Sequence, residues 1–453
     1  MRVFFIGIGG IGMSALARYC KHAGYEVAGY DRTPSELTSE LEAEGIAIHY
    51  DDCVANIPES FRNIDTLVVY TPAVPNDSNE LNWFRNNGNE VRKRSAILGQ
   101  IARDKKTLAV AGTHGKTTTS TMLAWLLNET GKPCTAFLGG ISKNFNSNLL
   151  LATSELLVVE ADEYDRSFLQ LYPQIAIVTA ADADHLDIYG TEKEMKNTFG
   201  QFVAQIDPDG VLILKKDVDI PLNGIRCRTV SYSYNNSAAD FYAFNIEQQN
   251  GFYRFDIHTP NFTIENCTLG LPGKVNVENA VAAVAAAIFA GADINKISQA
   301  LATFVGVKRR FDVQINTPQH VYIDDYAHHP EELSAAITSI RQMFPDRKIL
   351  AIFQPHLYTR TRDFADQFAQ SLSLPDELIL LDIYPARELP IAGVSSQIIF
   401  DKVTIDKKTM CRKDDLLALL KTIDIDVVVT LGAGDIDRFV APINEMLGEK
   451  IQD

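Results

Sequence analysis

The chain has 453 residues, of which 46% are hydrophobic and 22% are charged, and its formal net charge at pH 7 is −16. This composition is typical of globular proteins, and at about 150 residues per domain the length predicts about three domains. The negative charge argues against a general nucleic-acid or anionic-membrane surface, because both reward a basic protein face. It still permits an anionic substrate, since local glycine amides, Lys and Arg can bind phosphate.

The cysteines and the first residues predict a cytoplasmic protein. The six cysteines are scattered without a C-x-x-C pair or zinc spacing, so we expect reduced, mostly structural thiols. The opening "MRVFFIGIGG" reaches glycine after a few apolar residues, unlike a signal peptide. No apolar run approaches the roughly 18 residues that a membrane span requires, so no membrane insertion is expected.

The first segment predicts a nucleotide-binding sheet. An apolar strand at residues 3–6 is followed by Gly7-x-Gly9-x-x-Gly12 and a helical stretch, and the next strand, "YEVAGYD", ends at Asp31. In this setting the glycines let the backbone approach a pyrophosphate, and an acidic residue after the second strand can bind a ribose hydroxyl. The pattern fits NAD or a nucleotide-diphosphate sugar, and a purely structural turn is the alternative.

A second strand–loop–helix pattern begins near residue 105. Its loop, Gly112-Thr113-His114-Gly115-Lys116-Thr117, lacks the glycine that the full G-x-x-x-x-G-K-[ST] pattern places at residue 110. We still expect a phosphate site, with Lys116 reaching the β- and γ-phosphates and Thr117 binding Mg²⁺ through its hydroxyl.

Acidic residues and a histidine follow the next two apolar strands. Glu160, Asp162 and Glu163 end one strand, and His185 ends the next, within "DADHLDIYG". Carboxylates beside a phosphate loop commonly hold Mg²⁺, although a solvent-facing loop is the alternative, and His185 is equally a ligand or a structural residue. Residues 211–270 alternate and carry turn residues, which predicts antiparallel hairpins attached to the central domain. An alanine-rich helix, "NVENAVAAVAAAIF", follows.

A third alternation of strands and helices follows the basic cluster Lys308, Arg309 and Arg310. This cluster is either a solvated hinge or a source of an Arg that reaches nucleotide phosphate when domains close. Polar residues end the strands in "DDYAHHPEE" and "QPHLYTRTRDF". The adjacent His328 and His329 point in different directions in regular structure, so a metal site built on both is not expected. The predicted domains are residues 1–104, 105–308 and 309–453.

Together these motifs resemble the ATP-dependent Mur ligases over nearly the whole chain. In that family the phosphate loop has the short form seen here, so Val110 in place of the first glycine is compatible with phosphate binding. The motifs that carry the resemblance occur in order as "GIGGIGMS" at 7–14, "AGTHGKTTT" at 111–119, "EADEYDRSF" at 160–168, "DADHLDIY" at 182–189, "NVEN" at 276–279, "KRRF" at 308–311, "DDYAHHP" at 324–330 and "QPHLYTRTRDF" at 354–364.

The resemblance implies a three-domain α/β enzyme. A Rossmann-like N-terminal domain would bind the UDP of the substrate. A central P-loop ATPase-like parallel sheet with an antiparallel β extension would bind ATP and Mg²⁺, and a Rossmann-like C-terminal domain would close over both. ATP would phosphorylate the lactyl carboxylate of UDP-N-acetylmuramate, and the amine of L-alanine would attack the acyl phosphate, in peptidoglycan precursor synthesis.

The resemblance also implies roles for single residues. ATP would be bound by Gly112, Thr113, His114, Gly115, Lys116, Thr117, Thr118, Asn279, Arg309, Arg310 and Asp324. The other substrates would be bound by Gly7, Gly9, Gly10, Ile11, Gly12, Asp31, Thr71, Pro72, Tyr326 and His356. Mg²⁺ would be held by Thr117, Glu160 and His185, and the catalytic residues would be Lys116, Glu160, His185, His328 and Arg360. Gly200 and Gln201 occupy the region where some members carry a carbamylated lysine, so that modification is not predicted.

Three other functions stay open at this point. A related recycling ligase joins a tripeptide to the same sugar nucleotide, and Tyr164 is typical of it. An NAD-dependent oxidoreductase would use the first glycine loop and Asp31 but leaves the second phosphate loop unexplained. A nucleotide-regulated binding module would bind ATP without turnover.

Overall fold

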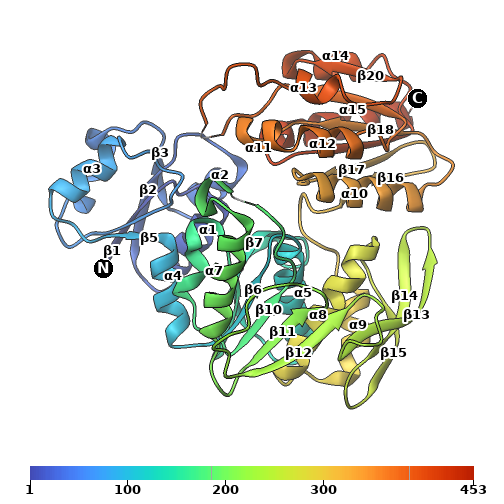
Figure 1. The fold of residues 1–453 in the computed structure, drawn as a ribbon. Coiled ribbons are helices and arrows are strands. Elements are labelled where there is room, and N and C mark those ends of the chain that lie inside the picture. Colours follow the sequence, from blue (N-terminus) through green and yellow to red (C-terminus); the bar gives the residue numbers. More distant parts are fainter. Residues whose placement is uncertain (185, 387, 453) are drawn as a thin grey trace. The chain divides into compact units, whose positions relative to one another are not determined.

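The computed structural model describes residues 1–184, 186–386 and 388–452, and it contains three β-sheets with flanking helices (Figure 1). The chain forms two compact units. The first consists of Met1–Asn245, Phe255–Cys267 and Glu278–Phe304, and the second of Ile246–Arg254, Thr268–Val277 and Val305–Asp453. The three α/β sheets confirm the predicted fold class, whereas the predicted domain boundaries stay a prediction.

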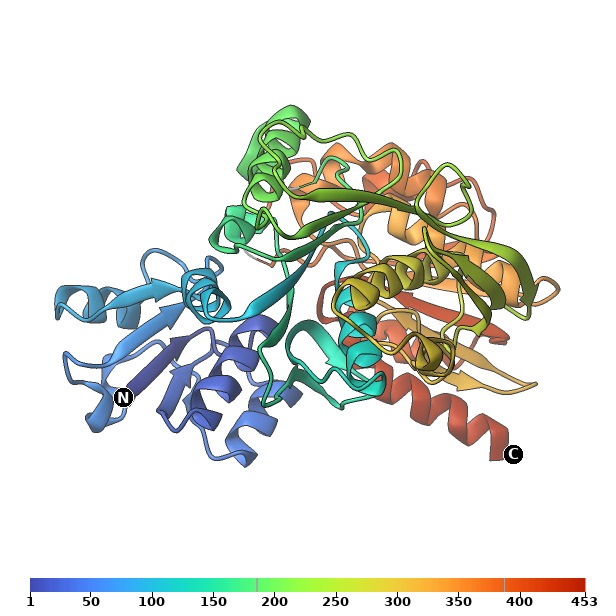
Figure 2. The same ribbon diagram turned by 90° about the horizontal axis from the view of Figure 1, so that it is seen from below.

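The N-terminal sheet is parallel, with the strand order β3-β2-β1-β4-β5 (Figure 2). Val3 and Phe5 of β1 pack with α1 and α4, whereas Phe4 packs with α3 on the opposite face. Helices on both faces explain why this strand is a continuous apolar run. The elements are β1 (Arg2–Ile6), α1 (Ile11–His22), β2 (Glu26–Tyr30), α2 (Glu36–Ala43), β3 (Ala47–His49), η1 (Val54–Asn56), η2 (Glu59–Phe61), β4 (Leu67–Tyr70), α3 (Asn79–Asn86), β5 (Val91–Lys93) and α4 (Arg94–Arg103).

The central sheet has ten strands in the order β15-β14-β13-β12-β11-β10-β6-β9-β7-β8. Strands β11, β10, β6, β9 and β7 are parallel, and β8 is antiparallel to β7. The elements are β6 (Lys106–Ala111), α5 (Lys116–Glu129), β7 (Thr135–Ser142), β8 (Ser147–Leu150), β9 (Leu156–Glu160), η3 (Tyr164–Gln170), β10 (Ile175–Val178), α6 (Leu186–Tyr189), α7 (Glu192–Ala204), β11 (Val211–Lys215), β12 (Arg228–Ser233), β13 (Phe241–Gln249), β14 (Phe252–His258), β15 (Thr263–Thr268), α8 (Lys274–Phe289) and α9 (Ile294–Ala302).

The prediction of antiparallel hairpins for residues 211–270 was only partly right. β12 pairs with β11 in parallel, and β13 overlaps β12 in parallel through only two residue pairs. Alternation of polar and apolar residues indicates a half-buried strand. It does not indicate whether that strand is parallel or antiparallel to its neighbour, because this depends on how the strands pair in the folded sheet. The expected hairpin does join β13 to β14, through Asn250 and Gly251. Both have positive φ, as a two-residue hairpin turn of this composition requires.

The C-terminal sheet has the order β16-β17-β21-β18-β19-β20, with β16 antiparallel to β17 and the other pairs parallel. Ile349 and Ala351 of β18 pack with α10 and α12, whereas Leu350 and Ile352 pack with α14 and α15 on the other face. The elements are β16 (Asp312–Asn316), β17 (Val321–Asp325), α10 (Pro330–Met343), β18 (Ile349–Phe353), α11 (Tyr358–Asp363), α12 (Ala365–Ser371), β19 (Glu377–Leu381), α13 (Gln397–Phe400), β20 (Lys408–Cys411), η4 (Lys413–Asp415), α14 (Leu416–Leu420), β21 (Val427–Leu431), η5 (Asp435–Phe439) and α15 (Val440–Gln452).

Among the described residues, no helix has the length and apolar character that crossing a bilayer demands.

Packing against the C-terminal sheet predicts a stability difference between two leucines. Leu447 of α15 is fully buried, whereas Leu389 is 85% exposed. We expect Leu447→Ala to lower the free energy of unfolding by about 2–5 kcal/mol, because it leaves a cavity in the core. Leu389→Ala should change it by less than about 0.5 kcal/mol. Urea-induced unfolding followed by circular dichroism measures both, and equal effects would contradict the assigned packing.

Candidate functional site

The phosphate loop lies where three parallel strands of the central sheet end together. Ala111 of β6 pairs with Val178 of β10, and Val110 pairs with Glu160 of β9. The loop after β6, the residues after β10 and the carboxylate of Glu160 therefore share one edge of the sheet. This is the edge where ligands bind in open α/β sheets.

The loop backbone is held tightly against the end of β10. Gly112 and Gly115 have φ of 130° and 79°, which L-residues with side chains rarely adopt. A Cβ on Gly112 would lie 2.1 Å from Thr179 Oγ1. The Thr179 hydroxyl is within hydrogen-bond distance of the carbonyl oxygens of Ala111 and His114, and the Thr113 amide donates to Ala180 O at 3.2 Å. The glycines are therefore required for the loop's shape.

Helix α5 begins directly after this loop, at Lys116, and its N-cap residue, Gly115, has no side chain with which to cap it. The first backbone N–H groups of a helix have no partner within the helix and attract anions. Thr117 and Thr118 are buried in this first turn. His114 is half-buried, and its Nε2 lies 3.9 Å from Asp182. The predicted phosphate-binding residues 112–118 thus form one continuous loop and helix start.

Lys116 is held in place by acceptors on both sides. Its Nζ donates to Gly112 O at 2.6 Å and pairs with Glu163 Oε1 at 2.9 Å. Burial by itself would lower the pKa of Lys116, but the carboxylates of Glu163, Glu160 and Asp162 raise it above its ordinary value. Lys116 therefore stays charged at neutral pH and presents a fixed cation at the loop.

Glu160 has the features of a metal ligand. Its Oε2 is buried and finds no hydrogen-bond partner among the described residues. A Cβ on Gly139 of β7 would lie only 2.0 Å from this oxygen, so the missing side chain of Gly139 makes room for the carboxylate. Glu160 Oε2 and the Thr117 hydroxyl are oxygen donors of the kind that Mg²⁺ prefers. His185, predicted as a third ligand and catalytic residue, lies outside the described residues.

The acidic loop after β9 is anchored from two directions. The Tyr189 hydroxyl donates to the backbone oxygen of Glu163. On the other side, Lys93 Nζ pairs with Asp165 at 2.6 Å. Asp165 and Arg166 have φ of 54° and 55°, a left-handed conformation that is uncommon without glycine. Such conformations persist only where surrounding contacts hold them, and they cluster at functional sites.

The N-terminal glycine-rich loop contacts Asp31 directly. The Gly9 amide donates to Asp31 Oδ2 at 2.8 Å, and a Cβ on Gly9 would lie 2.9 Å from the same oxygen. Gly7 has φ of 84°, and a Cβ there would lie 3.0 Å from Thr71 Cγ2. Helix α1 begins at Ile11 after Gly10, again without a side-chain cap. Pro72 follows in the half-buried loop after β4.

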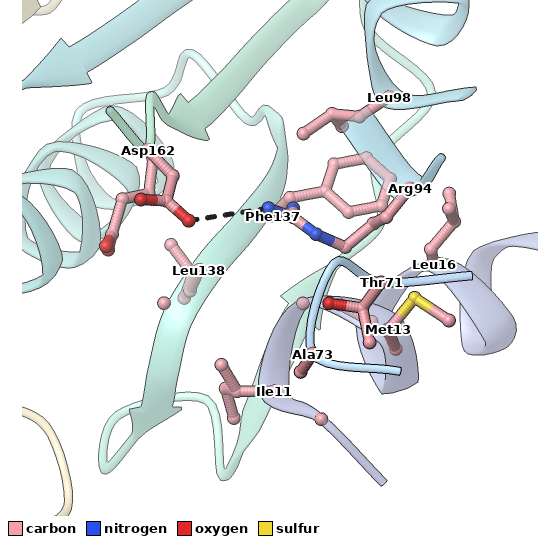
Figure 3. Close-up of a pocket in the computed structure, with 15 residues that line it drawn as sticks. Ile11, Met13, Leu16, Thr71, Ala73, Arg94, Leu98, Phe137, Leu138 and Asp162 are labelled. Atoms are coloured by element: carbon pink, nitrogen blue, oxygen red, sulfur yellow. Dashed lines mark ion pairs between the residues drawn. The ribbon is translucent and has the colours of Figure 1, made fainter. Parts of the chain in front are cut away.

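A cavity of about 290 Å³ connects this loop to the acidic loop (Figure 3). Gly10, Gly12 and Thr71 line it from the N-terminal sheet, and Glu160 and Asp162 line it from the central sheet. Its further lining residues are Ile11, Met13, Ala15, Leu16, Ala73, Arg94, Leu98, Phe137, Leu138 and Gly139. Two sites that the sequence predicted separately thus open into one space.

Arg94 crosses this cavity and was missed by sequence reasoning. Its Nη2 lies 3.6 Å from Asp162 Oδ2, and a Cβ on Gly12 would lie 3.0 Å from its Nη1. Figure 3 shows the Arg94 side chain reaching toward Asp162. The basic run "RKR" at 92–94, just before a helix, was the available signal. Gly139 carried no sequence signal, because its importance depends on the distant Glu160.

Asn279 of α8 lies against the phosphate loop. A Cβ on Gly115 would lie 2.9 Å from Asn279 Oδ1, and Asn279 is buried. The first unit therefore brings together the predicted nucleotide residues 112–118 and 279. The predicted contact of Asn279 with adenine stays a prediction.

The remaining predicted residues lie in the second unit, where Arg309 and Asp324 pair with each other. Arg309 Nε lies 3.3 Å from Asp324 Oδ2, and its Nη2 donates to Gly432 O at 2.7 Å. Asp324 is buried and also accepts from the Thr430 hydroxyl at 2.6 Å. Within this unit, Arg309 and Asp324 thus join the basic cluster to the C-terminal sheet.

Aromatic and basic side chains gather beside this pair. The Arg310 guanidinium lies 4.7 Å from the centre of the Tyr326 ring, and the Tyr326 and His328 rings are 5.2 Å apart. The rings of His328 and His356 are 5.9 Å apart. Arg360 is buried in α11. The structure thus places the rings of Tyr326, His328 and His356 next to one another, and their predicted roles stay a prediction.

The comparisons with known proteins agree with this architecture. Models of the Mur ligase family match the chain at residues 2–106 (catalytic domain), 110–287 (middle domain) and 309–434 (glutamate ligase domain). A UDP-N-acetylmuramate–L-alanine ligase from Parabacteroides distasonis is 53% identical over 455 residues, covering 99% of this chain and 98% of the relative. The chain belongs to the Mur ligase family. The resemblance seen in the sequence is thereby confirmed.

Solved structures have the same fold as this Mur ligase. The crystal structure of a UDP-N-acetylmuramate–alanine ligase from Thermotoga maritima matches with a TM-score of 0.82 and 28% identity, covering 100% of this chain and 99% of that one. A murein peptide ligase from Psychrobacter arcticus matches with a TM-score of 0.75 and 23% identity, covering 98% and 99%. The second likeness concerns the fold alone.

The contact between Gly139 and Glu160 predicts a sensitive position in this Mur ligase. Gly139→Ala should displace the Glu160 carboxylate and raise the Mg²⁺ concentration needed for half-maximal activity by about tenfold or more, as lost support of a metal ligand does. A Mg²⁺ titration of activity measures this. Gly448→Ala is the control, because nothing lies within 4 Å of a Cβ there. An unchanged Mg²⁺ requirement in the Gly139 variant would contradict the role assigned to Glu160.

Asp325 predicts a pH-dependent stability. Burial raises its pKa from 3.8 to about 6, although Arg310 and the amides of Ala327 and Phe311 oppose the rise. The folded state therefore binds more protons than the unfolded state between these values. The free energy of unfolding that Asp325 contributes falls as the pH rises through this window.

The test for Asp325 is a comparison with Asp325→Asn, which cannot titrate. Urea unfolding at matched pH values from 4 to 7 should show wild type losing stability relative to the variant as pH rises. A constant difference between the two proteins would contradict the raised pKa.

Proposed function

We propose that this Mur ligase joins L-alanine to the lactyl carboxylate of UDP-N-acetylmuramate, with conversion of ATP to ADP and phosphate, in peptidoglycan precursor synthesis. The observation that carries the proposal is the cavity between the glycine-rich loop and Glu160. A substrate with a diphosphate at one end and a reacting carboxylate at the other requires binding groups at both ends of such a space. The names of the relatives support L-alanine as the amino acid.

The proposed chemistry has two steps. A carboxylate is a poor acyl donor, so a carboxylate oxygen first attacks the γ-phosphorus of ATP, the bond to the β–γ bridging oxygen breaks, and ADP leaves. The amine nitrogen of L-alanine then attacks the acyl carbon and loses a proton, and inorganic phosphate leaves. Phosphoryl transfer of this kind depends mainly on positioning and on neutralising charge.

The residues of the first unit suit the first step. The fixed charge of Lys116 and the uncapped N-terminus of α5 favour the ATP phosphates. Thr117 and Glu160 would hold Mg²⁺, with His185 kept as a third predicted ligand. When bound, this ion would neutralise phosphate charge. Arg94 offers a second cation between the glycine-rich loop and Asp162, where a substrate anion would pass.

The residues of the second unit are proposed to serve ATP and the acceptor. Arg309 is engaged by Asp324, Gly432 O and Asp437, which favours Arg310 as the residue that reaches phosphate. Arg310 lies on the Tyr326 ring. His328, His356 and Arg360 are proposed to lie around the amino acid and the acyl phosphate.

The tripeptide-recycling ligase, which Tyr164 suggested from the sequence, is the alternative, and the names of the most similar relatives do not favour it. Ligases of the two kinds would share the glycine-rich loop, the phosphate loop and Glu160, so these residues do not separate them. The NAD-dependent oxidoreductase is disfavoured, because it gives no role to Lys116 and its three carboxylates.

Acceptor-dependent phosphate release distinguishes these candidates. ATP, Mg²⁺ and UDP-N-acetylmuramate are incubated with L-alanine, with the tripeptide, or with no acceptor. We expect release that depends on L-alanine. Phosphate release that occurs only with the tripeptide would identify the protein as the recycling ligase. If neither acceptor causes phosphate release, both proposed ligase activities are contradicted.

Removing the Lys116 charge should abolish the reaction. Lys116→Ala is expected to lower the rate of product formation by about 10²–10³-fold or more, as loss of one group that stabilises transition-state charge does. Lys106→Ala is the matched control, because Lys106 lies on the adjoining strand, 59% exposed and paired only with Glu155 among the described residues. Retained ligase activity in the Lys116 variant would refute the phosphate-site assignment.

A further inference from the structure

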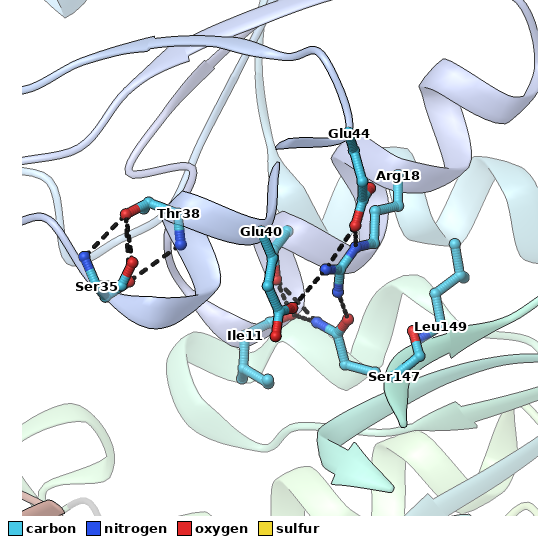
Figure 4. A network of polar contacts seen from close by, with 10 residues as sticks. Ile11, Arg18, Ser35, Thr38, Glu40, Glu44, Ser147 and Leu149 are labelled. Atoms are coloured by element: carbon cyan, nitrogen blue, oxygen red, sulfur yellow. Dashed lines mark hydrogen bonds and ion pairs between the residues drawn. The ribbon is translucent and has the colours of Figure 1, made fainter. Parts of the chain in front are cut away.

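Asn148 of β8 is fully buried where the β7–β8 hairpin packs against helix α1. Figure 4 shows its chain neighbours Ser147 and Leu149 on the side of α1 that carries Ile11 and Arg18. Its Nδ2 donates to Ile11 O at 2.6 Å and to Ser14 Oγ at 2.8 Å. Its Oδ1 accepts from Arg18 Nη1 at 2.6 Å. An amide side chain offers two N–H donors and one oxygen. Both donors and the oxygen of Asn148 are therefore directed to α1, which carries the glycine-rich loop at its start.

Arg18 extends this contact to helix α2. Its Nη2 pairs with Glu40 at 2.8 Å, its Nε donates to Glu44 at 2.8 Å, and only 11% of its side chain is exposed. Figure 4 shows the guanidinium between these two carboxylates and the hairpin. Helix α2 also carries Thr38, whose Cγ2 would lie 2.7 Å from a Cβ on Gly9. Asn148 is thus connected to the glycine-rich loop along α1 and, through Arg18, along α2.

The same hairpin contacts the phosphoryl-transfer residues through its other strand. Phe137, Leu138 and Gly139 of β7 line the cavity, and Gly139 lies directly against the Glu160 carboxylate. Tyr19 of α1 packs on Phe137, with ring centres 5.4 Å apart. One hairpin therefore touches both the start of α1 and Glu160.

We propose that Asn148 is a positioning residue that fixes the glycine-rich loop at a set distance from Glu160. The inference rests on the proposed function, in which the loop binds the diphosphate of the sugar nucleotide and the reacting carboxylate lies near Glu160. A displacement of about 1 Å between reacting groups can lower a rate about 10²-fold. Three short hydrogen bonds from one buried side chain restrict such a displacement of α1.

Steady-state kinetics with ADP binding tests the proposal. In Asn148→Ala we expect kcat to fall by about tenfold or more, because the reacting groups are misaligned. The Kd for ADP and the number of ADP sites per chain should stay within about twofold of wild type, because the phosphate loop does not contact Asn148. A merely structural role would instead lower the number of ADP sites in proportion to activity, and that result would overturn the proposal.

Two further variants make the test specific. Asn144→Ala is the matched control: it changes the same residue type in the same hairpin, and the Asn144 side chain donates to Thr303 O at 2.9 Å, an acceptor after α9. Its kcat should match wild type. Arg18→Met removes both the connection to α2 and the hydrogen bond to Asn148 Oδ1, and it should lower kcat by about threefold or more. Equal effects of the Asn144 and Asn148 variants would overturn the proposal.

Hydrogen exchange separates this inference from the proposed function. In the protein without ligands, backbone amides of residues 8–14 should exchange about tenfold faster in Asn148→Ala than in wild type, while those of residues 112–118 should be unchanged. This result would support the positioning role even if wild type released no phosphate with L-alanine. Unchanged exchange in residues 8–14 would overturn it whatever the activity.

Discussion

The largely buried charge of Lys116 is the constraint around which the nucleotide site is built. A lysine in this setting must have partners, because an isolated buried cation is costly. Gly112 O and Glu163 supply them directly, and Glu160 and Asp162 add negative potential. These groups come from segments far apart in the sequence. The phosphate loop and the end of β9 must therefore meet at one edge of the sheet before Lys116 can be accommodated.

Parallel strands make this meeting possible. The ends of β6, β9 and β10 are in register, so that each strand delivers its following residues to the same edge. Close approach then requires glycine, at Gly112 against Thr179 and at Gly139 against Glu160. Glycine is required at residue 112 because the tight loop has a positive φ there. It is required at residue 139 only because β7 packs beside β9, which carries Glu160.

The cavity adds a second level of organisation. One end of the cavity is lined by the N-terminal sheet and the other by the central sheet. The sequence predicted these two sheets as separate alternations of strand and helix. Arg94 and the β7–β8 hairpin lie between them and determine how the glycine-rich loop faces Glu160. In the second unit, Arg309 pairs with Asp324 beside Thr430, and the guanidinium groups of both Arg309 and Arg310 lie over the Tyr326 ring.

The three α/β segments, the short phosphate loop and the acidic strand ends could all be predicted from the sequence, because they depend on local hydrophobic periodicity and on motifs of neighbouring residues. The sequence also indicated the Mur ligase family through motifs in order. The sequence did not determine the direction of β12, since alternation is the same in parallel and antiparallel strands. Arg94, Gly139 and Asn148 gain their importance from contacts with residues 162, 160 and 11–18. These contacts can be seen only in the folded protein, because each one joins segments that are far apart in the sequence and whose spacing follows no motif.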